Sequence, residues 1–202
     1  MHERSRAPWI ACPPVTSNVM TSPLMRAESS TLLVVDVQEK LLPHMHEAER
    51  VLENCLWLVR VAHRLQVPVV ASEQYPQGLG PTVAQLRAAL ENSVVRQKVN
   101  FSCAGEPAIM QLEAMARAQI VLAGTEAHVC VLQTALELRA LGKQVFAVAD
   151  AVSSRVPANR DLGLARMRDA GVQIVSREMV AFEWLKHAGT SLFREVSREF
   201  LR

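Results

Sequence analysis

The stretch 124–142, GTEAHVCVLQTALELRALG, connects a predicted strand to a predicted helix. Residues 119–123 form a short apolar run just before it, which is typical of a buried strand. Beyond Gly124 the period changes to the three- and four-residue spacing of a helix face, at Val131, Thr134, Ala135, Leu138 and Leu141. Gly142 stands where a helix commonly ends in a left-handed residue. Cys130 is therefore predicted to lie where a strand has ended and a helix begins.

The position of Cys130 suits a nucleophile. The first turn of a helix has unpaired N–H groups and the positive end of the helix dipole, and both favour a thiolate over a thiol. We therefore expect the pKa of the Cys130 thiol to be lowered, and iodoacetamide to alkylate this cysteine much faster than Cys55 or Cys103. The alternative is that Cys130 is a small buried apolar residue, as many free cysteines are.

Strand-like and helix-like segments alternate along most of the chain. Apolar runs predict six strands, at residues 31–37, 67–72, 94–98, 119–123, 145–150 and 172–175. Helical periodicity predicts further helices at residues 47–66, 106–116, 157–170, 178–186 and 190–200. Apolar runs without alternation are typical of strands that are covered on both faces. The sequence therefore predicts an α/β fold with a doubly wound, mainly parallel six-stranded sheet and helices on both faces.

Residues 1–29 differ from the rest of the chain. They mix prolines, serines and isolated apolar residues without a period, which predicts a disordered N-terminal extension followed by one domain at residues 30–202. The extension lacks the continuous apolar core of a secretory signal. A transit peptide is one alternative, and a true start at Met20 or Met25 is another.

The composition excludes several classes of protein. The 202 residues carry 22 Lys and Arg against 20 Asp and Glu, a formal net charge of +2. No basic run would follow a nucleic acid, and no apolar run approaches the roughly 20 residues that span a bilayer. The four cysteines have no CxxC spacing, which argues against a disulfide framework or a zinc cluster and favours a reducing compartment. We expect a cytoplasmic protein without nucleic-acid or membrane partners.

Three reactive residues follow three different predicted strands. Asp36 comes after the first strand, Lys98 ends the third, and Cys130 follows the strand at 119–123. In an open α/β sheet the carboxyl ends of the strands meet at one edge, where ligands bind. A carboxylate that takes a thiol proton, a lysine and a thiol at a helix start would form a nucleophilic set. The alternatives are that Asp36 caps a following turn and that Lys98 is simply solvated.

The segments around these residues, LLVVDVQEKLLP, RQKVNFSC and AGTEAHVCVLQTALELRALG, resemble in this order the motifs of the isochorismatase-like cysteine hydrolases. The resemblance is continuous from about residue 31 to residue 180. It implies a Rossmann-like three-layer fold in which Cys130 is the nucleophile, Asp36 the general base and Lys98 the electrostatic partner of Asp36.

The resemblance also implies a cis peptide bond between Thr125 and Glu126. Such a bond would turn the N–H of Glu126 toward that of Cys130, so that the two N–H groups form an oxyanion hole. We further expect Gln74, Tyr75, Phe101 and His128 to contact the substrate. For His128, capping of the following helix is an equally open alternative.

One departure separates the chain from the nicotinamidases of this family, which carry an Asp-x-His metal site after the second strand. Here the position reads Ser72-Glu73-Gln74-Tyr75, and no histidine follows as far as Lys98. Because neutral imidazole is the usual ligand of such a site, we predict no catalytic metal and no cofactor. The string SEQYPQGLGPTV resembles instead a metal-free, poorly characterised branch of the family.

The sequence thus predicts a hydrolase of small amides or related substrates that acts through a covalent intermediate on Cys130. A nicotinamidase-type amidase is one alternative, and a catalytically quiet binding or scaffold protein is another. The resemblance implies a homo-oligomer. The apolar residues Val180, Phe182, Trp184 and Leu185 are candidates for its interface, unless they pack against the protein's own sheet.

Overall fold

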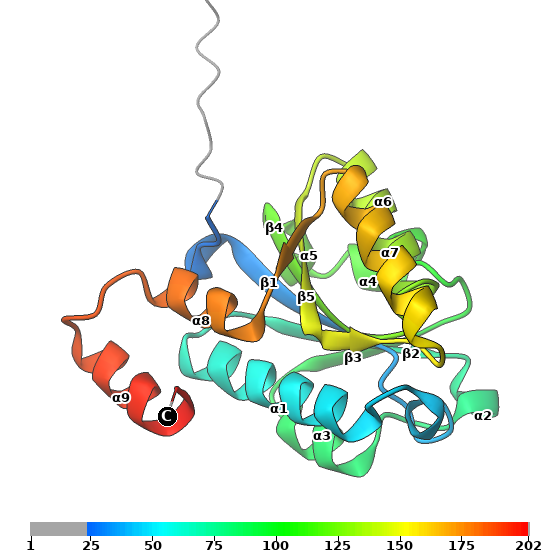
Figure 1. The fold of residues 1–202 in the computed structure, drawn as a ribbon, viewed down its shortest axis with the longest axis horizontal. Helices are drawn as coiled ribbons and strands as arrows, with labels where there is room; N and C mark the ends of the chain where they lie inside the picture. The colour runs from blue at the N-terminus through cyan, green and yellow to red at the C-terminus, as the bar shows by residue number, and fades with distance from the viewer. Residues whose placement is uncertain (1–23, 202) are drawn as a thin grey trace, which may run out of the picture.

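A computed structural model describes residues 24–201, and residues 1–23 and 202 lie outside this described part (Figure 1). Six parallel strands form one sheet in the order β3-β2-β1-β4-β5-β6. Their bounds are β1 Ser30–Val35, β2 Val69–Gln74, β3 Val94–Lys98, β4 Gln119–Thr125, β5 Gln144–Ser153 and β6 Gln173–Val175. The chain runs outward from β1 to β3 and then returns to the other side of β1. The predicted doubly wound fold is therefore confirmed.

Helices cover both faces of the sheet (Figure 1). On one face lie α1 (Ala48–Arg64), α3 (Ala84–Ala89) and α8 (Arg177–Leu185), with α9 (Ser191–Phe200) packed against α1. On the other lie α6 (Cys130–Ala140) and α7 (Pro157–Asp169), with the one-turn helices α4 (Pro107–Met110) and α5 (Glu113–Ala116) nearby. The short α2 (Pro76–Leu79) and the 3₁₀ turns η1 (Ala27–Ser29), η2 (Leu42–His44) and η3 (Cys103–Gly105) complete the described elements.

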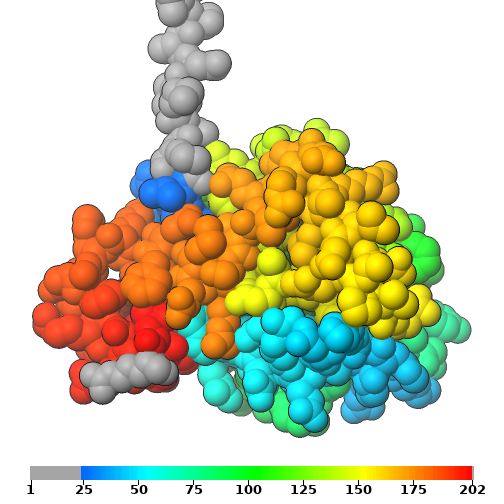
Figure 2. All heavy atoms as spheres, viewed as in Figure 1, coloured from blue at the N-terminus to red at the C-terminus, as the bar shows by residue number. Residues whose placement is uncertain are grey.

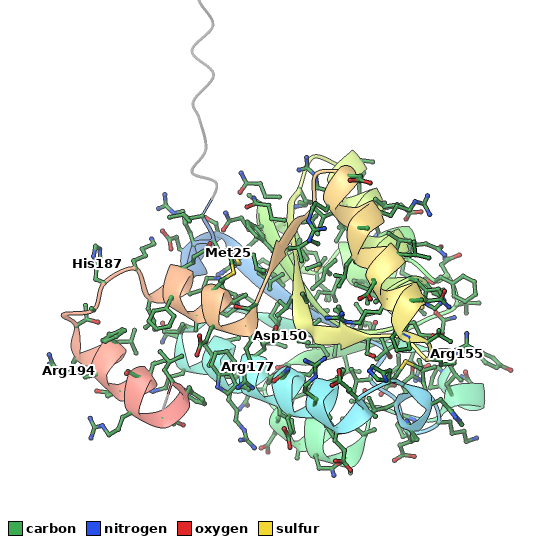
Figure 3. The ribbon with its side chains drawn as sticks, in the orientation of Figure 1. Met25, Asp150, Arg155, Arg177, His187 and Arg194 are labelled. Carbon is green, nitrogen blue, oxygen red and sulfur yellow. The ribbon has the colours of Figure 1, made fainter. Side chains whose placement is uncertain are left out.

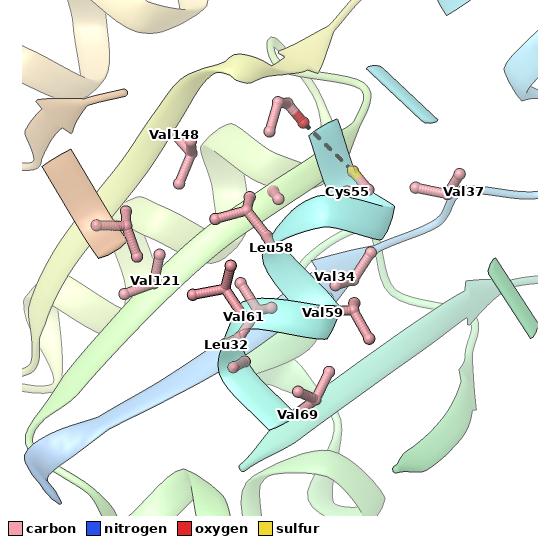
Figure 4. Packing of buried hydrophobic residues seen from close by; sticks show 14 of the residues in the cluster. Leu32, Val34, Val37, Cys55, Leu58, Val59, Val61, Val69, Val121 and Val148 are labelled. Atoms are coloured by element: carbon pink, nitrogen blue, oxygen red, sulfur yellow. Dashed lines mark hydrogen bonds between the residues drawn. The ribbon is translucent and has the colours of Figure 1, made fainter. Parts of the chain in front are cut away.

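Two apolar clusters hold the three layers together. Successive residues of a strand point to opposite faces, so Leu32 and Val34 of β1 belong to the cluster under α1, whereas Leu33 and Val35 belong to the cluster under α6. Figure 4 shows the first cluster, in which the Cys55 thiol donates a 3.6 Å hydrogen bond to the carbonyl oxygen of Ala151. Burial raises the pKa of this thiol to about 12, and the charge of Asp150 adds to the effect. Cys55 is therefore a structural residue.

Residues 24–29 pack against the domain, so the prediction of disorder is wrong for these six residues. Met25 is fully buried beside α8 (Figure 3), and its N–H donates a 2.6 Å hydrogen bond to Glu183. The indole of Trp184 donates to the hydroxyl of Ser30, where β1 begins. Several further hydrogen bonds to the domain, together with this buried side chain, hold the segment although it has no periodicity. Residues 1–23 of the predicted extension lie outside the described residues.

Two further elements differ in detail from the prediction. The predicted helix at 106–116 is two separate turns, α4 and α5, because Leu112 between them has an extended backbone. In α8, Val180, Trp184 and Leu185 are buried against the protein's own core, whereas Phe182 is 49 % exposed. Figure 2 shows α8 and α9 as the orange-to-red end of the molecule. Of the candidate interface residues, Phe182 alone is thus available to a partner.

In the described part of the chain, no helix combines the length and the apolar character that crossing a membrane requires.

Candidate active site

Two of the three predicted catalytic residues, Asp36 and Cys130, lie at the point where the direction of the strand order reverses. Asp36 follows β1 directly, and Cys130 is the first residue of α6, which follows the neighbouring strand β4. The Thr125 hydroxyl, at the end of β4, donates a 2.7 Å hydrogen bond to the carbonyl oxygen of Asp36. Ligands of doubly wound sheets bind in the crevice at this reversal. The fold therefore brings these residues together at the edge where a ligand site is expected.

Asp36 and Lys98 form a buried ion pair. The Lys98 ammonium lies 2.7 Å from Oδ2 of Asp36, and neither side chain is exposed to solvent. The Ser72 hydroxyl donates a 2.7 Å hydrogen bond to Oδ1 of the same carboxylate. Burial lowers the pKa of Lys98, but the charges of Asp36 and Cys130 and the hydrogen bond to Asp36 outweigh it and leave the pKa above its ordinary value. Asp36 thus contacts Lys98 and Ser72, and Lys98 is not a solvated surface residue.

Cys130 lies at the start of α6 with 5 % of its surface exposed. The expectation of a lowered thiol pKa is wrong for the free protein. Burial raises the pKa of the Cys130 thiol, and Asp36 raises it further through its charge and a hydrogen bond, while Lys98 opposes the shift. The expectation rested on the helix start, whereas desolvation and the nearby carboxylate determine the direction of the shift. At neutral pH the thiol therefore keeps its proton until a base removes it.

Alkylation of Cys130 by iodoacetamide is expected to accelerate about tenfold per pH unit between about pH 7 and pH 9. Below a raised pKa the thiolate fraction grows tenfold for each unit of pH, and the thiolate is the reactive form. Cys130 should still react before Cys55 and Cys103, because those two side chains have no exposed surface. Peptide mapping after brief treatment at each pH measures both quantities. A plateau below pH 8 would show instead that the thiol pKa is lowered.

The loop before α6 presents two backbone donors. The Thr125–Glu126 peptide bond is cis, and the carbonyl oxygen of Glu126 accepts the N–H groups of Val129 and Val131, on either side of Cys130. Among the described residues, the N–H groups of Glu126 and Cys130 have no hydrogen-bond acceptor. Two free donors beside a thiol fit the oxyanion of a tetrahedral intermediate.

Gly163 of α7 allows that helix to approach the same loop. A Cβ atom at Gly163 would lie 2.9 Å from the carbonyl oxygen of Ala127 and 3.1 Å from Cα of His128. Gly163→Ala is therefore expected to displace the loop and to slow catalysis about tenfold, because small displacements of catalytic groups are costly. The matched control is Gly189→Ala, where the new methyl group would meet nothing within 4 Å. Equal rates for the two variants would show that the loop tolerates the displacement.

The four predicted substrate contacts differ in their exposure to solvent. Tyr75 and Phe101 are 55 % and 52 % exposed and lie in the segments that follow β2 and β3. Gln74 is buried, and its amide oxygen accepts a 2.6 Å hydrogen bond from Lys98. His128 is half-buried, with Nδ1 2.9 Å from the Ser154 hydroxyl, and no side chain caps α6. The capping alternative for His128 is therefore wrong.

The position of the nicotinamidase metal site is occupied by a different network. Glu73 is buried, and one of its carboxylate oxygens accepts hydrogen bonds from the N–H and the hydroxyl of Thr82 and from Arg87. Its neighbours Ser72 and Gln74 are engaged with Asp36 and Lys98. Within residues 24–201, no group of three His, Cys, Asp or Glu side chains could hold a metal ion. The Glu73 carboxylate, at the position of the nicotinamidase metal ligands, instead holds the loop after β2 through its hydrogen bonds to Thr82.

Comparison with known proteins agrees with this arrangement. A model of the isochorismatase domain matches residues 30–179, which span most of the chain. The chain belongs to the isochorismatase family. Isochorismatase domain-containing protein 2 of Danio rerio is 35 % identical over 175 residues, which cover 86 % of this chain and 88 % of that protein. The Homo sapiens protein of the same name is 37 % identical over 173 residues, covering 84 % and 82 %.

Solved structures share the fold of this isochorismatase-family protein. The MAR1 ribonuclease from Caenorhabditis elegans has a TM-score of 0.82 and 33 % identity, with 89 % of this chain and 93 % of that chain covered. The YcaC gene product of Escherichia coli, described as an octameric hydrolase of unknown specificity, has a TM-score of 0.75 and 26 % identity, covering 82 % and 83 %. The family resemblance noted in the sequence is therefore confirmed.

Proposed function

We propose that this protein is a cysteine hydrolase of small amides or related acyl compounds, with Cys130 as nucleophile, Asp36 as general base and Lys98 as the electrostatic partner of Asp36. The single observation that carries the proposal is the buried Asp36–Lys98 pair beside a thiol at the start of a helix. A buried ion pair is seldom needed for stability alone, and perturbed titratable groups tend to gather at functional sites.

The raised pKa of the thiol determines the order of the steps. Asp36 takes the proton of Cys130 as the sulfur attacks the carbonyl carbon, and the N–H groups of Glu126 and Cys130 receive the developing oxyanion. The tetrahedral intermediate collapses, the carbon–nitrogen bond breaks, and Asp36 returns the proton to the leaving amine. Water then attacks the thioester while Asp36 removes its proton. The carbon–sulfur bond breaks, the acid leaves, and the thiol regains its proton.

The comparisons support hydrolysis at a coarser level. The Escherichia coli relative is described as a hydrolase, and its specificity is unknown. The nicotinamidase PncA from Bacillus subtilis shares the fold, with 18 % identity and a TM-score of 0.63. The nicotinamidase-type alternative is disfavoured because Glu73, at the position of the nicotinamidase metal site, is hydrogen-bonded to Thr82 and Arg87.

A ribonuclease is a second candidate, because the Caenorhabditis elegans relative carries that name at 33 % identity. Cleavage of RNA needs cations that neutralise phosphate. At this site, however, the Lys98 ammonium is already occupied by Asp36, Gln74 and the carbonyl oxygen of Phe101. We therefore favour acyl transfer and include RNA in the test.

The test uses a panel of small primary amides, the chromogenic ester p-nitrophenyl acetate and a labelled single-stranded RNA. Wild-type protein is expected to hydrolyse the ester with an initial burst, because acylation precedes release of the acyl group, and to hydrolyse at least one amide. Cys130→Ala is expected to show neither reaction. Cleavage of RNA by the wild type and by Cys130→Ala alike, without ester or amide turnover, would overturn the proposal. A protein inactive on all three would be a binding or scaffold protein.

Activity is expected to survive exhaustive chelation. The proposed chemistry uses a thiol and a carboxylate, and Ser72, Glu73 and Gln74 are committed to neighbours instead of to a metal. The measurement is the rate of p-nitrophenyl acetate hydrolysis before and after dialysis against a strong chelator. A loss that zinc or iron restores would show that a metal takes part.

We further propose that the protein forms a homo-oligomer and acts on a small molecule in the cytoplasm, without nucleic-acid or membrane partners. The Escherichia coli relative is described as octameric. Light scattering on the eluting protein in size-exclusion chromatography tests the oligomer, and a mass of one chain would contradict it.

A further inference from the structure

The two ends of the catalytic ion pair come from strands that are not neighbours. Asp36 follows β1 and Lys98 ends β3, and β2 lies between these two strands in the sheet. The pair can therefore form only across the carboxyl end of β2. In the register of the sheet, Ser72 of β2 is paired with Val35, the residue before Asp36, and Gln74 is paired with Lys98.

Ser72 and Gln74 contact the two halves of the pair. They are two residues apart on one strand, so their side chains point to the same face of the sheet. The Ser72 hydroxyl donates a 2.7 Å hydrogen bond to Oδ1 of Asp36, and Lys98 donates a 2.6 Å hydrogen bond to the amide oxygen of Gln74. Both β2 side chains are buried. Side chains of β2, the strand between β1 and β3, thus contact both Asp36 and Lys98.

The orientation of Gln74 is itself fixed. Its side-chain nitrogen donates a 2.7 Å hydrogen bond to the carbonyl oxygen of Val99, so its amide oxygen must face Lys98. Gln38, which is fully buried, accepts from the N–H of Gln74 at 2.7 Å and donates to its carbonyl oxygen at 3.0 Å. Both ends of the Gln74 amide are thus engaged by the protein itself. This arrangement differs from the substrate-contact role expected from the sequence.

We propose that Ser72 and Gln74 are positioning residues that hold the Asp36 carboxylate and the Lys98 ammonium in the geometry required for proton transfer from Cys130. This inference rests on the proposed cysteine hydrolase function. The Ser72 hydroxyl stabilises the ionised form of Asp36, because a hydrogen bond donated to a carboxylate favours its charged state. The Gln74 amide oxygen accepts a hydrogen bond from the same ammonium that pairs with the carboxylate.

The probe for Ser72 is the pH dependence of the acylation burst with p-nitrophenyl acetate. Acylation needs ionised Asp36, so the rate falls at low pH. In Ser72→Ala the carboxylate loses the hydrogen bond that favours its charged form, and the acid limb of the burst profile is expected to move upward by about one pH unit. Ser72→Thr retains a hydroxyl and should restore the wild-type limb. The control is Ser30→Ala, which removes an equally buried hydroxyl bonded to Gln119 at the other end of β1.

The probe for Gln74 separates positioning from substrate binding. Gln74→Met is expected to lower the limiting acylation rate about tenfold while leaving the half-saturating concentration of p-nitrophenyl acetate unchanged. Gln119→Met is the matched control, because Gln119 is a buried glutamine whose amide is also bonded at both ends, far from Cys130 in the fold. A higher half-saturating concentration at an unchanged limiting rate would assign Gln74 to substrate binding and overturn its positioning role.

Other outcomes distinguish this inference from the function on which it rests. If Ser72→Ala lowers the rate equally at every pH, as loss of folded protein would, the positioning role of Ser72 is wrong although the hydrolase stands. A burst that persists in Cys130→Ala would overturn the proposed function itself. Melting temperatures of all variants show what fraction of each is folded at the assay temperature, and Ser72→Thr keeps the test decisive if Ser72→Ala does not fold.

Discussion

Replacing Asp36 with asparagine is expected to slow hydrolysis of p-nitrophenyl acetate by about 10²–10⁴-fold and, in the same protein, to accelerate alkylation of Cys130. In the wild type, burial and the carboxylate both raise the pKa of the thiol, and Lys98 opposes them. The variant keeps the lysine and loses the carboxylate, so the thiol pKa falls and more thiolate is present at neutral pH. Hydrolysis nevertheless slows, because no base remains to shuttle the proton to the leaving group or from the water.

This pair of opposite changes separates a catalytic from a structural role for Asp36. The variant leaves the buried Lys98 ammonium without its counter-ion, at a cost of about 3 kcal/mol in the free energy of unfolding, so its melting temperature must be recorded. Asp150→Asn is the control, because Asp150 is a half-buried aspartate that accepts a 2.9 Å hydrogen bond from the N–H of Arg177 away from the site (Figure 3). If the rate of ester hydrolysis and the rate of Cys130 alkylation in Asp36→Asn both fall together with the melting temperature, the role of Asp36 is structural.

Replacing Gly124 with alanine is expected to prevent folding. Gly124 ends the close pairing of β4 with β1 and has a φ of +112°, which side chains rarely adopt. A Cβ atom there would lie 2.0 Å from the carbonyl oxygen of Val35, and the backbone of β1 at that point leads directly into Asp36. Because no flexible side chain can yield, the cost should exceed about 4 kcal/mol, which is a large part of the stability of a typical domain.

The measurement is the yield of soluble, cooperatively melting protein. Gly142→Ala is the informative comparison: its φ of +82° imposes a similar backbone cost, but nothing lies within 4 Å of the new methyl group. Gly142→Ala should therefore lose about 1 kcal/mol and stay folded. Normal melting of Gly124→Ala would mean that β1 and β4 can separate locally, and the Asp36–Cys130 geometry would then need to be reconsidered.

The sequence was informative where a pattern is repeated and less so where a single contact decides. Six apolar runs alternating with helical periods predicted the doubly wound sheet, because strands that are covered on both faces are mostly apolar at successive positions. The placement of Asp36, Lys98 and Cys130 followed from the rule that strand ends share an edge. Met25 lies outside any pattern, so its burial could not be predicted from period or composition.

The misjudged properties of the site depend on distances that a sequence does not contain. The thiol pKa of Cys130 is the balance of burial, Asp36 and Lys98, and the sign of that balance is set by packing. Cys103 was treated only as a comparison residue, yet it is buried near the same ion pair. Burial and the charge of Asp36 raise its pKa to about 11, with Lys98 opposing. Ser72 was missed, although its alternation with Gln74, at the position where the nicotinamidases carry their metal site, is a signal that the sequence does contain.

The central claim, that Cys130 carries the acyl group, is tested most directly by trapping the intermediate. Wild-type protein is mixed with p-nitrophenyl acetate, quenched with acid during the burst, digested with trypsin and analysed by mass spectrometry. The tryptic peptide 118–139 contains Cys130 and no other cysteine or lysine. One added acetyl group is expected on this peptide and none on the corresponding peptide of Cys130→Ala, which should show no burst. Hydrolysis at the wild-type rate by Cys130→Ala, or a burst whose acetyl group lies on another peptide, would contradict this claim.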